Sequence, residues 1–362
     1  MPGDHDYPPP SGAPFGGPPP PGWMPPPGPP RRAWAPPPAA APPGVPPGML
    51  GAAHKPGAIP LRPLTLGDMY DAAFRIIRFN PKATVGSSVL VAAISMALPV
   101  LLTTVLTFAV DLTSDGSSDV STGEAIAIAG TTGSLLLGAL LQSIGLLLVT
   151  GMVAHVVSAA AIGRRLSLGE AWAATRGSRW RLIGLTLLLG LMLVAIAAAY
   201  AAVWVALALT APTWVLVVFG IVSVPAFVAF LVWWWIRVYY LPVPALMIER
   251  IGVIAAIGRA FRLTRRQFWR TLGIGLLTVI VTGIAGSMLA LPFTIAAQVV
   301  PIAMSDSQYF ALVTVVLAAL GSVVQTAFVT PFSAAVTSLQ YLDQRMRKEA
   351  YDVELLARAG IT

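Results

Sequence analysis

The chain has 362 residues, of which 56% are hydrophobic and only 10% are charged, and its formal net charge is +8. Because soluble domains carry about 25% charged residues, this composition excludes a water-soluble surface over most of the protein. The absence of cysteine also excludes a disulfide framework, a thiolate zinc site and a cysteine nucleophile.

Proline is concentrated at the start of the chain, where 24 of the 33 prolines lie at or before Pro63. Blocks such as PPPSGAPFGG cannot bury a core, so residues 1–63 are predicted to form a disordered, Pro/Gly-rich cytoplasmic tail. One interpretation is a low-complexity extension. The other, which we favour, is a polyproline ligand for a cytoplasmic protein partner, with Trp23 and Trp34 as anchors.

From residue 64 onward, long apolar runs dominate the chain. Crossing a hydrocarbon core of about 30 Å takes about 20 residues of helix. Six runs reach that length, at approximately residues 83–110, 126–162, 182–209, 214–236, 272–300 and 310–339. The sequence therefore predicts an all-α, polytopic helix bundle over residues 64–348, followed by a short cytoplasmic segment at 349–362.

The positive charges predict the orientation of the spans. All 23 Lys and Arg residues lie in the tail, before the first span, between spans two and three, between spans four and five, or after the sixth span. The other three connections contain none. Since Lys and Arg near span ends stay in the cytoplasm, we expect a multi-pass protein of the plasma membrane with both termini cytoplasmic.

A basic amphipathic helix is predicted before the first, third and fifth spans, so that three units of surface helix plus hairpin build the protein. The first two units share the opening L-[TS]-L-G-[DE], at residues 64–68 and 166–170. In the first unit, the predicted apolar face consists of Leu66, Tyr70, Ala73 and Ile77. In the third, a continuous helix over residues 254–272 would align four arginines on one face. We expect the basic faces to bind anionic lipid headgroups through Arg259, Arg262, Arg266, Arg270, Arg176, Arg179, Arg181, Arg75, Arg78 and Lys82.

Three segments carry a resemblance to a known family: LTLGDMYDAAFRIIRFNPKA, LPVPALMIERIGVIAAIGRAFRLTRRQFWRTLG and the closing YLDQRMRKEAYDVEL. Together they resemble actinobacterial membrane proteins with a glycerophosphoryl diester phosphodiesterase membrane domain, over roughly residues 64–356. The closing motif is the most specific part. The resemblance implies a six-helix membrane module without the phosphodiesterase domain, and it implies no chemistry.

Signals of catalysis are missing from the sequence. There is no G-x-S-x-G, P-loop or H-E-x-x-H motif and no pair of carboxylates inside a span, so we expect no enzyme activity, no metal and no cofactor. His155, Gln142 and Gln325 are polar residues within spans and form a candidate intramembrane polar site. A structural role for His155, as a neutral imidazole hydrogen-bonded to a neighbouring helix, is the alternative.

Two functions follow from these patterns. The first is a non-enzymatic membrane protein that binds anionic lipid and recruits partners through its tail. The second is a transporter or lipid-handling protein with a path between the hairpins, near His155 and the fifth span. Nucleic acid is not an expected partner, because the apolar faces of the basic helices commit them to the membrane. The sequence leaves the oligomeric state open.

Overall fold

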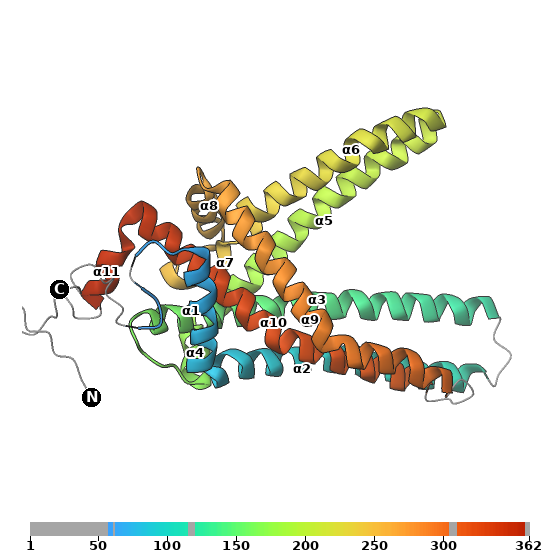
Figure 1. Cartoon of the computed structure of the whole chain (residues 1–362). Helices are drawn as coiled ribbons and strands as arrows, with labels where there is room; N and C mark the ends of the chain where they lie inside the picture. Colours follow the sequence, from blue (N-terminus) through green and yellow to red (C-terminus); the bar gives the residue numbers. More distant parts are fainter. Residues whose placement is uncertain (1–56, 61, 115–119, 304–309, 359–362) are drawn as a thin grey trace, which may run out of the picture. The chain divides into compact units, whose positions relative to one another are not determined.

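Figure 1 shows the computed structural model, which describes residues 57–60, 62–114, 120–303 and 310–358. Within these ranges all regular structure is helical. The elements in chain order are α1 (Leu66–Phe79), α2 (Pro81–Ser114), α3 (Val120–Ala161), α4 (Leu168–Ala174), α5 (Arg179–Thr210), α6 (Thr213–Trp234), the π-helix η2 (Trp235–Tyr239), α7 (Pro242–Glu249), α8 (Val253–Thr264), α9 (Phe268–Ala303), α10 (Phe310–Glu349) and α11 (Tyr351–Arg358).

The prediction of an all-α membrane protein with six spans is confirmed. Six stretches of the described helices are long and apolar enough to cross a membrane: Pro81–Leu102, Leu140–Ala161, Arg179–Thr210, Thr213–Glu249, Phe268–Val300 and Val313–Glu349. The fourth is longer than expected, because η2 follows α6 directly and α7 begins after only two further residues.

Four of the spans, α2, α3, α9 and α10, pack together, and α10 contacts each of the other three (Figure 1). Two glycines allow the closest approaches. A Cβ at Gly145 of α3 would lie 2.4 Å from a methyl of Val91 on α2, and a Cβ at Gly286 of α9 would lie 2.9 Å from a methyl of Val329 on α10. Small residues at helix interfaces are the usual means of tight packing in membranes, where apolar burial gives little driving force.

The α5–α6 hairpin packs differently. The buried residues of α5 are confined to its first three turns, between Leu182 and Leu189, and α6 buries only Trp234. Farther along, the two helices contact each other through Tyr200, whose ring stacks on Phe227 at 4.0 Å and whose hydroxyl lies 3.0 Å from Ser223 Oγ. The rest of the hairpin presents apolar side chains outward, as expected for a surface solvated by lipid.

Helix α1 confirms the predicted helix before the first span but not its predicted orientation. The expected apolar face was Leu66, Tyr70, Ala73 and Ile77, whereas the buried residues are Met69, Ala72, Ala73 and Ile76. They are buried by protein, since α1 packs on α10, α2 and α3. Tyr70 lies at the edge of the buried face, where its hydroxyl bonds to Thr278 Oγ1 on α9 at 3.1 Å, a tertiary contact that periodicity cannot show.

The bundle begins before residue 64 in the chain. Ile59, within the segment assigned from sequence to the tail, is fully buried in the same core as α1. The backbone N–H of Ala58 donates to the carbonyl of Ala160, near the end of α3, at 2.8 Å. Residues 1–56 lie outside the described part of the chain, so the predicted disorder of the tail stays a prediction.

Candidate functional site

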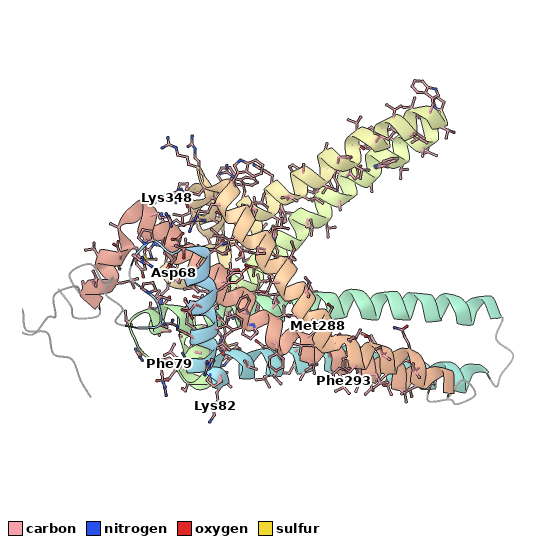
Figure 2. All side chains as sticks on the ribbon, in the orientation of Figure 1. Asp68, Phe79, Lys82, Met288, Phe293 and Lys348 are labelled. Carbon is pink, nitrogen blue, oxygen red and sulfur yellow. The ribbon has the colours of Figure 1, made fainter. Side chains whose placement is uncertain are left out.

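The charged side chains gather at one end of the bundle, which is formed by α1, α4, α7, α8, α11 and the adjoining ends of α9 and α10. We refer to it as the charged end. Figure 2 shows Asp68, Lys82 and Lys348 there, whereas Met288 and Phe293 lie farther along α9.

A basic recess of about 580 Å³ lies at this end, between α1 and the turn after α3. Its lining includes Arg75 and Arg78 from the last turns of α1 and Arg165 from the turn. One wall is the segment at Gly57 and Ala58. A Cβ at Gly57 would lie 2.2 Å from the carbonyl oxygen of Ala160, so only glycine allows this close approach to α3.

The recess retains uncompensated positive charge. Arg75 pairs with Asp71 at 2.5 Å, one turn earlier on α1. The guanidinium of Arg165 lies over the ring of Phe79, 4.1 Å from its centre, which orients the side chain without neutralising it. Arg78 is exposed and makes no ion pair with a described residue. The recess therefore presents at least two cations to an incoming anion.

Several of the predicted headgroup ligands are used inside the protein instead. Arg259 of α8 donates to Glu249 Oε1 at 2.8 Å and to Glu349 Oε2 at 2.6 Å, and 19% of its side chain is exposed. Tyr341 also donates to Glu249. Burial by itself lowers the pKa of Arg259, but hydrogen bonds to the two glutamates and the negative charge of Glu249 raise it by more. Arg259 therefore stays charged as a bridge between α7, α8 and α10.

Arg270 belongs to a second internal cluster, which we call the Leu64 clamp. Asp343 of α10 has no exposed side-chain surface and accepts from Arg270, from Arg347 Nε at 3.0 Å and from the backbone N–H of Leu64 at 2.7 Å. The Leu64 carbonyl in turn accepts from Arg270 Nη2 at 2.7 Å and from Arg347 Nη2 at 3.0 Å. These contacts hold the segment before α1 against the start of α9 and the end of α10.

The expectation of one continuous basic helix over residues 254–272 is wrong. Helix α8 ends at Thr264, Arg265 is extended, and Arg266 has a positive φ of 69° before α9 begins at Phe268. The break is stabilised by Lys348, whose Nζ donates to the carbonyls of Leu263 at 2.6 Å and Arg265 at 2.7 Å. A cation at these unpaired carbonyls satisfies the end of a helix as well as further turns would.

The helix expected before the third span is also interrupted, because α4 ends at Ala174 and Gly177 has φ 86°. Arg179 donates to the Trp172 carbonyl at 2.7 Å and lies over the Trp172 ring, while Arg181 donates to the Arg250 carbonyl at 3.0 Å. Five of the ten predicted ligands are exposed and make neither an ion pair nor a side-chain hydrogen bond with a described residue: Arg78, Lys82, Arg176, Arg262 and Arg266.

The three predicted intramembrane polar residues do not form one site. Gln142 and Gln325 line the same cavity, of about 310 Å³, between α2, α3 and α10. His155 lies 13 residues beyond Gln142 on α3, about 20 Å along the helix axis, and does not line that cavity. Its imidazole makes no hydrogen bond with a described residue, so the interhelical bond expected of a structural histidine is not found in that part of the chain.

Neither Arg165 nor any residue of the closing motif was among the predicted site residues. The signal for Arg165 was present in the repeated L-[TS]-L-G-[DE] opening, since the arginine directly precedes its second copy. For Asp343, Arg345 and Arg347 the signal was their i, i+2, i+4 spacing near the end of a long helix. Arg345, for example, bonds to Glu349 at 3.1 Å and covers the Tyr351 ring at 3.8 Å.

No three His, Cys, Asp or Glu side chains in the described ranges lie close enough together to hold a metal ion. Comparison with known proteins also yields no match, because no family model, curated protein or solved structure is similar to the chain. The resemblance to the phosphodiesterase membrane domain therefore stays a prediction.

Proposed function

We propose that the protein is a non-enzymatic, multi-pass membrane protein that binds an anionic lipid headgroup in the basic recess. The recess itself is the observation that supports this proposal most directly. Two sequence-distant segments bring Arg78 and Arg165 to one concave site, and the neighbouring Asp71 carboxylate pairs with Arg75 alone. Guanidinium groups suit this role, because they bind phosphate oxygens through planar pairs of N–H donors.

Exposed cations elsewhere at the charged end support the same function. Each Lys or Arg near an anionic surface contributes about 1 kcal/mol before screening by salt. Lys82, Arg176, Arg262 and Arg266 are exposed at the charged end and would add this unspecific attraction to the binding in the recess. The positive-inside rule places this end on the cytoplasmic side of the plasma membrane, and both termini with it.

A proline-rich tail on the same side would recruit a cytoplasmic protein with an aromatic-lined groove. On this proposal, deletion of residues 1–52 loses co-purifying proteins and leaves membrane insertion and lipid binding intact. Loss of insertion, or an unchanged set of co-purifying proteins, would refute this part.

The test of lipid binding compares two double variants that remove the same charge. Arg78→Gln with Arg165→Gln empties the recess of its unpaired cations, whereas Arg262→Gln with Arg266→Gln removes two exposed cations elsewhere at the charged end. The full chain is placed in nanodiscs that contain phosphatidylglycerol in phosphatidylcholine, and the retained lipid is counted by native mass spectrometry.

We expect the wild-type protein to retain one phosphatidylglycerol at fixed stoichiometry. The recess variant should bind it at least about tenfold more weakly, which corresponds to about 1.4 kcal/mol, while the surface variant loses less. Equal losses of affinity in the two variants would mean that the arginines of the recess contribute only to the general positive charge of the surface. Competition by inorganic phosphate at millimolar concentration would show instead that a free anion is the ligand.

A further inference from the structure

Polar side chains follow one face of α10 through the membrane-spanning part of the protein. Apart from the adjacent pair Gln325 and Thr326, they recur every three or four residues: Ser322, Gln325, Thr326, Thr330, Ser333 and Thr337. From first to last they cover 16 residues, or about 22 Å of a hydrocarbon core of about 30 Å. Interhelical contact alone does not require a polar face of this length.

Two cavities lie along this face. The first, of about 310 Å³, is the one that Gln142 and Gln325 share with Ser95 of α2. The second, of about 220 Å³, lies between α10, η2 and α9 and includes Tyr240 and Thr278 in its lining. Thr330, Ser333 and Leu146 line both, so the two cavities adjoin each other at this part of α10.

Most of these polar groups lack partners within the protein. Thr337 donates to the carbonyl of its own helix at Ser333, at 2.8 Å, which is the usual arrangement for a hydroxyl in a span. Gln325, Thr330 and Ser95 make no hydrogen bond with a described residue, although Thr330 and Ser95 are both only 4% exposed. The Tyr240 hydroxyl, beside Thr337, is buried and likewise makes no hydrogen bond of normal geometry in the described part of the chain.

A buried polar group without a partner is costly, and in a membrane no bulk water is at hand to supply one. A polar group bound in the cavities would supply these missing partners. Neither cavity is lined by Asp, Glu, Lys, Arg or His, so the sites offer no charge to an ion. They offer neutral hydroxyls and amides, together with the flat rings of Trp235, Tyr239 and Tyr240.

We propose that the adjoining cavities along α10 bind a neutral polyhydroxyl group, such as that of a sugar or cyclic polyol, within the membrane. Hydroxyls and amides that both donate and accept suit such a group, while the aromatic rings suit the apolar face of its ring. The group belongs either to a free solute or to the headgroup of a neutral glycolipid. This site is separate from the basic recess and does not depend on it.

The absence of native cysteine allows a direct test with the full chain in proteoliposomes. Ser333→Cys places a thiol where the cavities meet. Ser287→Cys is the matched control, because Ser287 is exposed on α9 within the span and lines neither cavity. Both are treated from the aqueous phase with a charged methanethiosulfonate reagent, which reacts with the thiolate and therefore needs water at the site.

We expect Ser333→Cys to react at least about tenfold faster than Ser287→Cys, because only the former lies in a hydrated cavity. Glucose or myo-inositol should slow the reaction if the ligand is a free solute. If it is a lipid, the slowing should appear only with glucosyl diacylglycerol in the bilayer. Either form of protection supports the site.

Equal reaction rates for the two thiols would overturn the proposal, because the cavities would then be dry. Fast labelling that none of the three probes slows would overturn it as well, since the cavities would hold water only. Ser95→Cys, on the opposite wall, repeats the measurement if the Ser333→Cys protein does not fold.

A second substitution tests recognition separately from hydration. Gln325→Leu in the Ser333→Cys background removes the amide at nearly constant size. Labelling of the thiol should stay fast, while protection by the sugar, polyol or glycolipid should weaken about tenfold. A tenfold loss is expected for one or two hydrogen bonds. Gln298→Leu is the matched control on α9, outside both cavities. Equal protection in the two variants would contradict the assigned ligand class.

Discussion

The two copies of the L-[TS]-L-G-[DE] opening begin their helices in the same way. In α1, Thr65 Oγ1 accepts from the Asp68 N–H at 3.2 Å, and Asp68 accepts in return from the Thr65 N–H at 3.0 Å. In α4, Ser167 and Glu170 make the same pair of bonds, at 3.2 Å and 2.8 Å. Both are capping boxes, which depend on local sequence alone.

The two copies differ in what surrounds them. The leucine before each cap donates its N–H to a side chain, but Leu64 meets the buried carboxylate of Asp343 at 2.7 Å, and Leu166 meets the neutral amide oxygen of Asn80 at 3.1 Å. Helix α1 then runs for 14 residues and α4 for only 7. The same local signal therefore decides where a helix starts, while tertiary contacts decide how firmly that start is held and how far the helix continues.

Among the variants that test this comparison, the one that removes the charge of Asp343 should lose the most stability. Asp343→Asn leaves Arg270 and Arg347 without a counter-charge while an amide oxygen still faces the Leu64 N–H. We expect a loss of about 3 kcal/mol in the free energy of unfolding, at the low end for a broken buried pair because both arginines are about one-third exposed. Thermal unfolding in detergent measures it, with Asp352→Asn as the control. A loss no larger than the control's would show that the Leu64 clamp contributes no stability.

The corresponding change at the second copy should cost less. Asn80→Ala removes the acceptor of the Leu166 N–H, so the expected loss is about 1 kcal/mol, as for a single neutral hydrogen bond. The Asn80 amide nitrogen has no partner among the described residues, which limits the loss further. Hydrogen exchange at the Leu166 amide should accelerate in this variant and stay unchanged in Asp343→Asn. The reverse pattern would contradict the hydrogen bond between Leu166 and Asn80.

The caps themselves should be nearly equivalent. Thr65→Ala and Ser167→Ala each remove one side-chain acceptor from an exposed helix start, and we expect each to cost about 0.5–1 kcal/mol. Unfolding curves of the two variants and of Thr65→Ser, which keeps the cap, give the comparison. If the losses of stability in Thr65→Ala and Ser167→Ala differ by more than either cap is expected to contribute, the surroundings, and not the local motif, determine the strength of the cap.

The smallest expected effect is the pH dependence of the second cap. Hydrogen bonds from the backbone and side chain of Ser167 hold the pKa of Glu170 below its usual range. Because the pKa is lower in the folded state, the stabilisation is present at neutral pH and is lost as the pH falls through the folded value. The difference in melting temperature between wild type and Glu170→Gln should therefore shrink towards zero at acid pH. A constant difference between pH 7 and pH 3 would mean that the charge of Glu170 has no part in the cap.

Prediction from sequence succeeded where the signal was local or spread over a long window. The six spans follow from composition over about 20 residues. The repeated opening was recognised as a repeat, and the structure shows that it also caps α1 and α4. Prediction failed where a distant residue decided the outcome. The break between α8 and α9 depends on Lys348, more than 80 residues away along the chain. The helical periodicity of residues 254–272 gives no indication of that contact.

The candidate sites show the same division. Arginine at the surface of a membrane protein is ambiguous from sequence, because the same spacing serves lipid binding, topology and internal ion pairs. Arg259 and Arg262 lie one turn apart on α8, yet the first bridges two glutamates and the second is exposed without an ion pair to a described residue. Gln142 and Gln325 were identified as polar residues within spans, but the cavity that joins them depends on the packing of α10 against α2 and α3.

By itself the sequence determined the all-helical class, the number of spans and the concentration of positive charge between alternate pairs of them, because hydrophobic length and charge bias act along the chain without reference to a partner. Only the tertiary structure decided which cations are paired with buried carboxylates, which are left for an anion, and where polar side chains from separate helices enclose a cavity. Ion pairing and enclosure depend on distances of a few ångströms between residues far apart in sequence, and those distances exist only once the helices have packed.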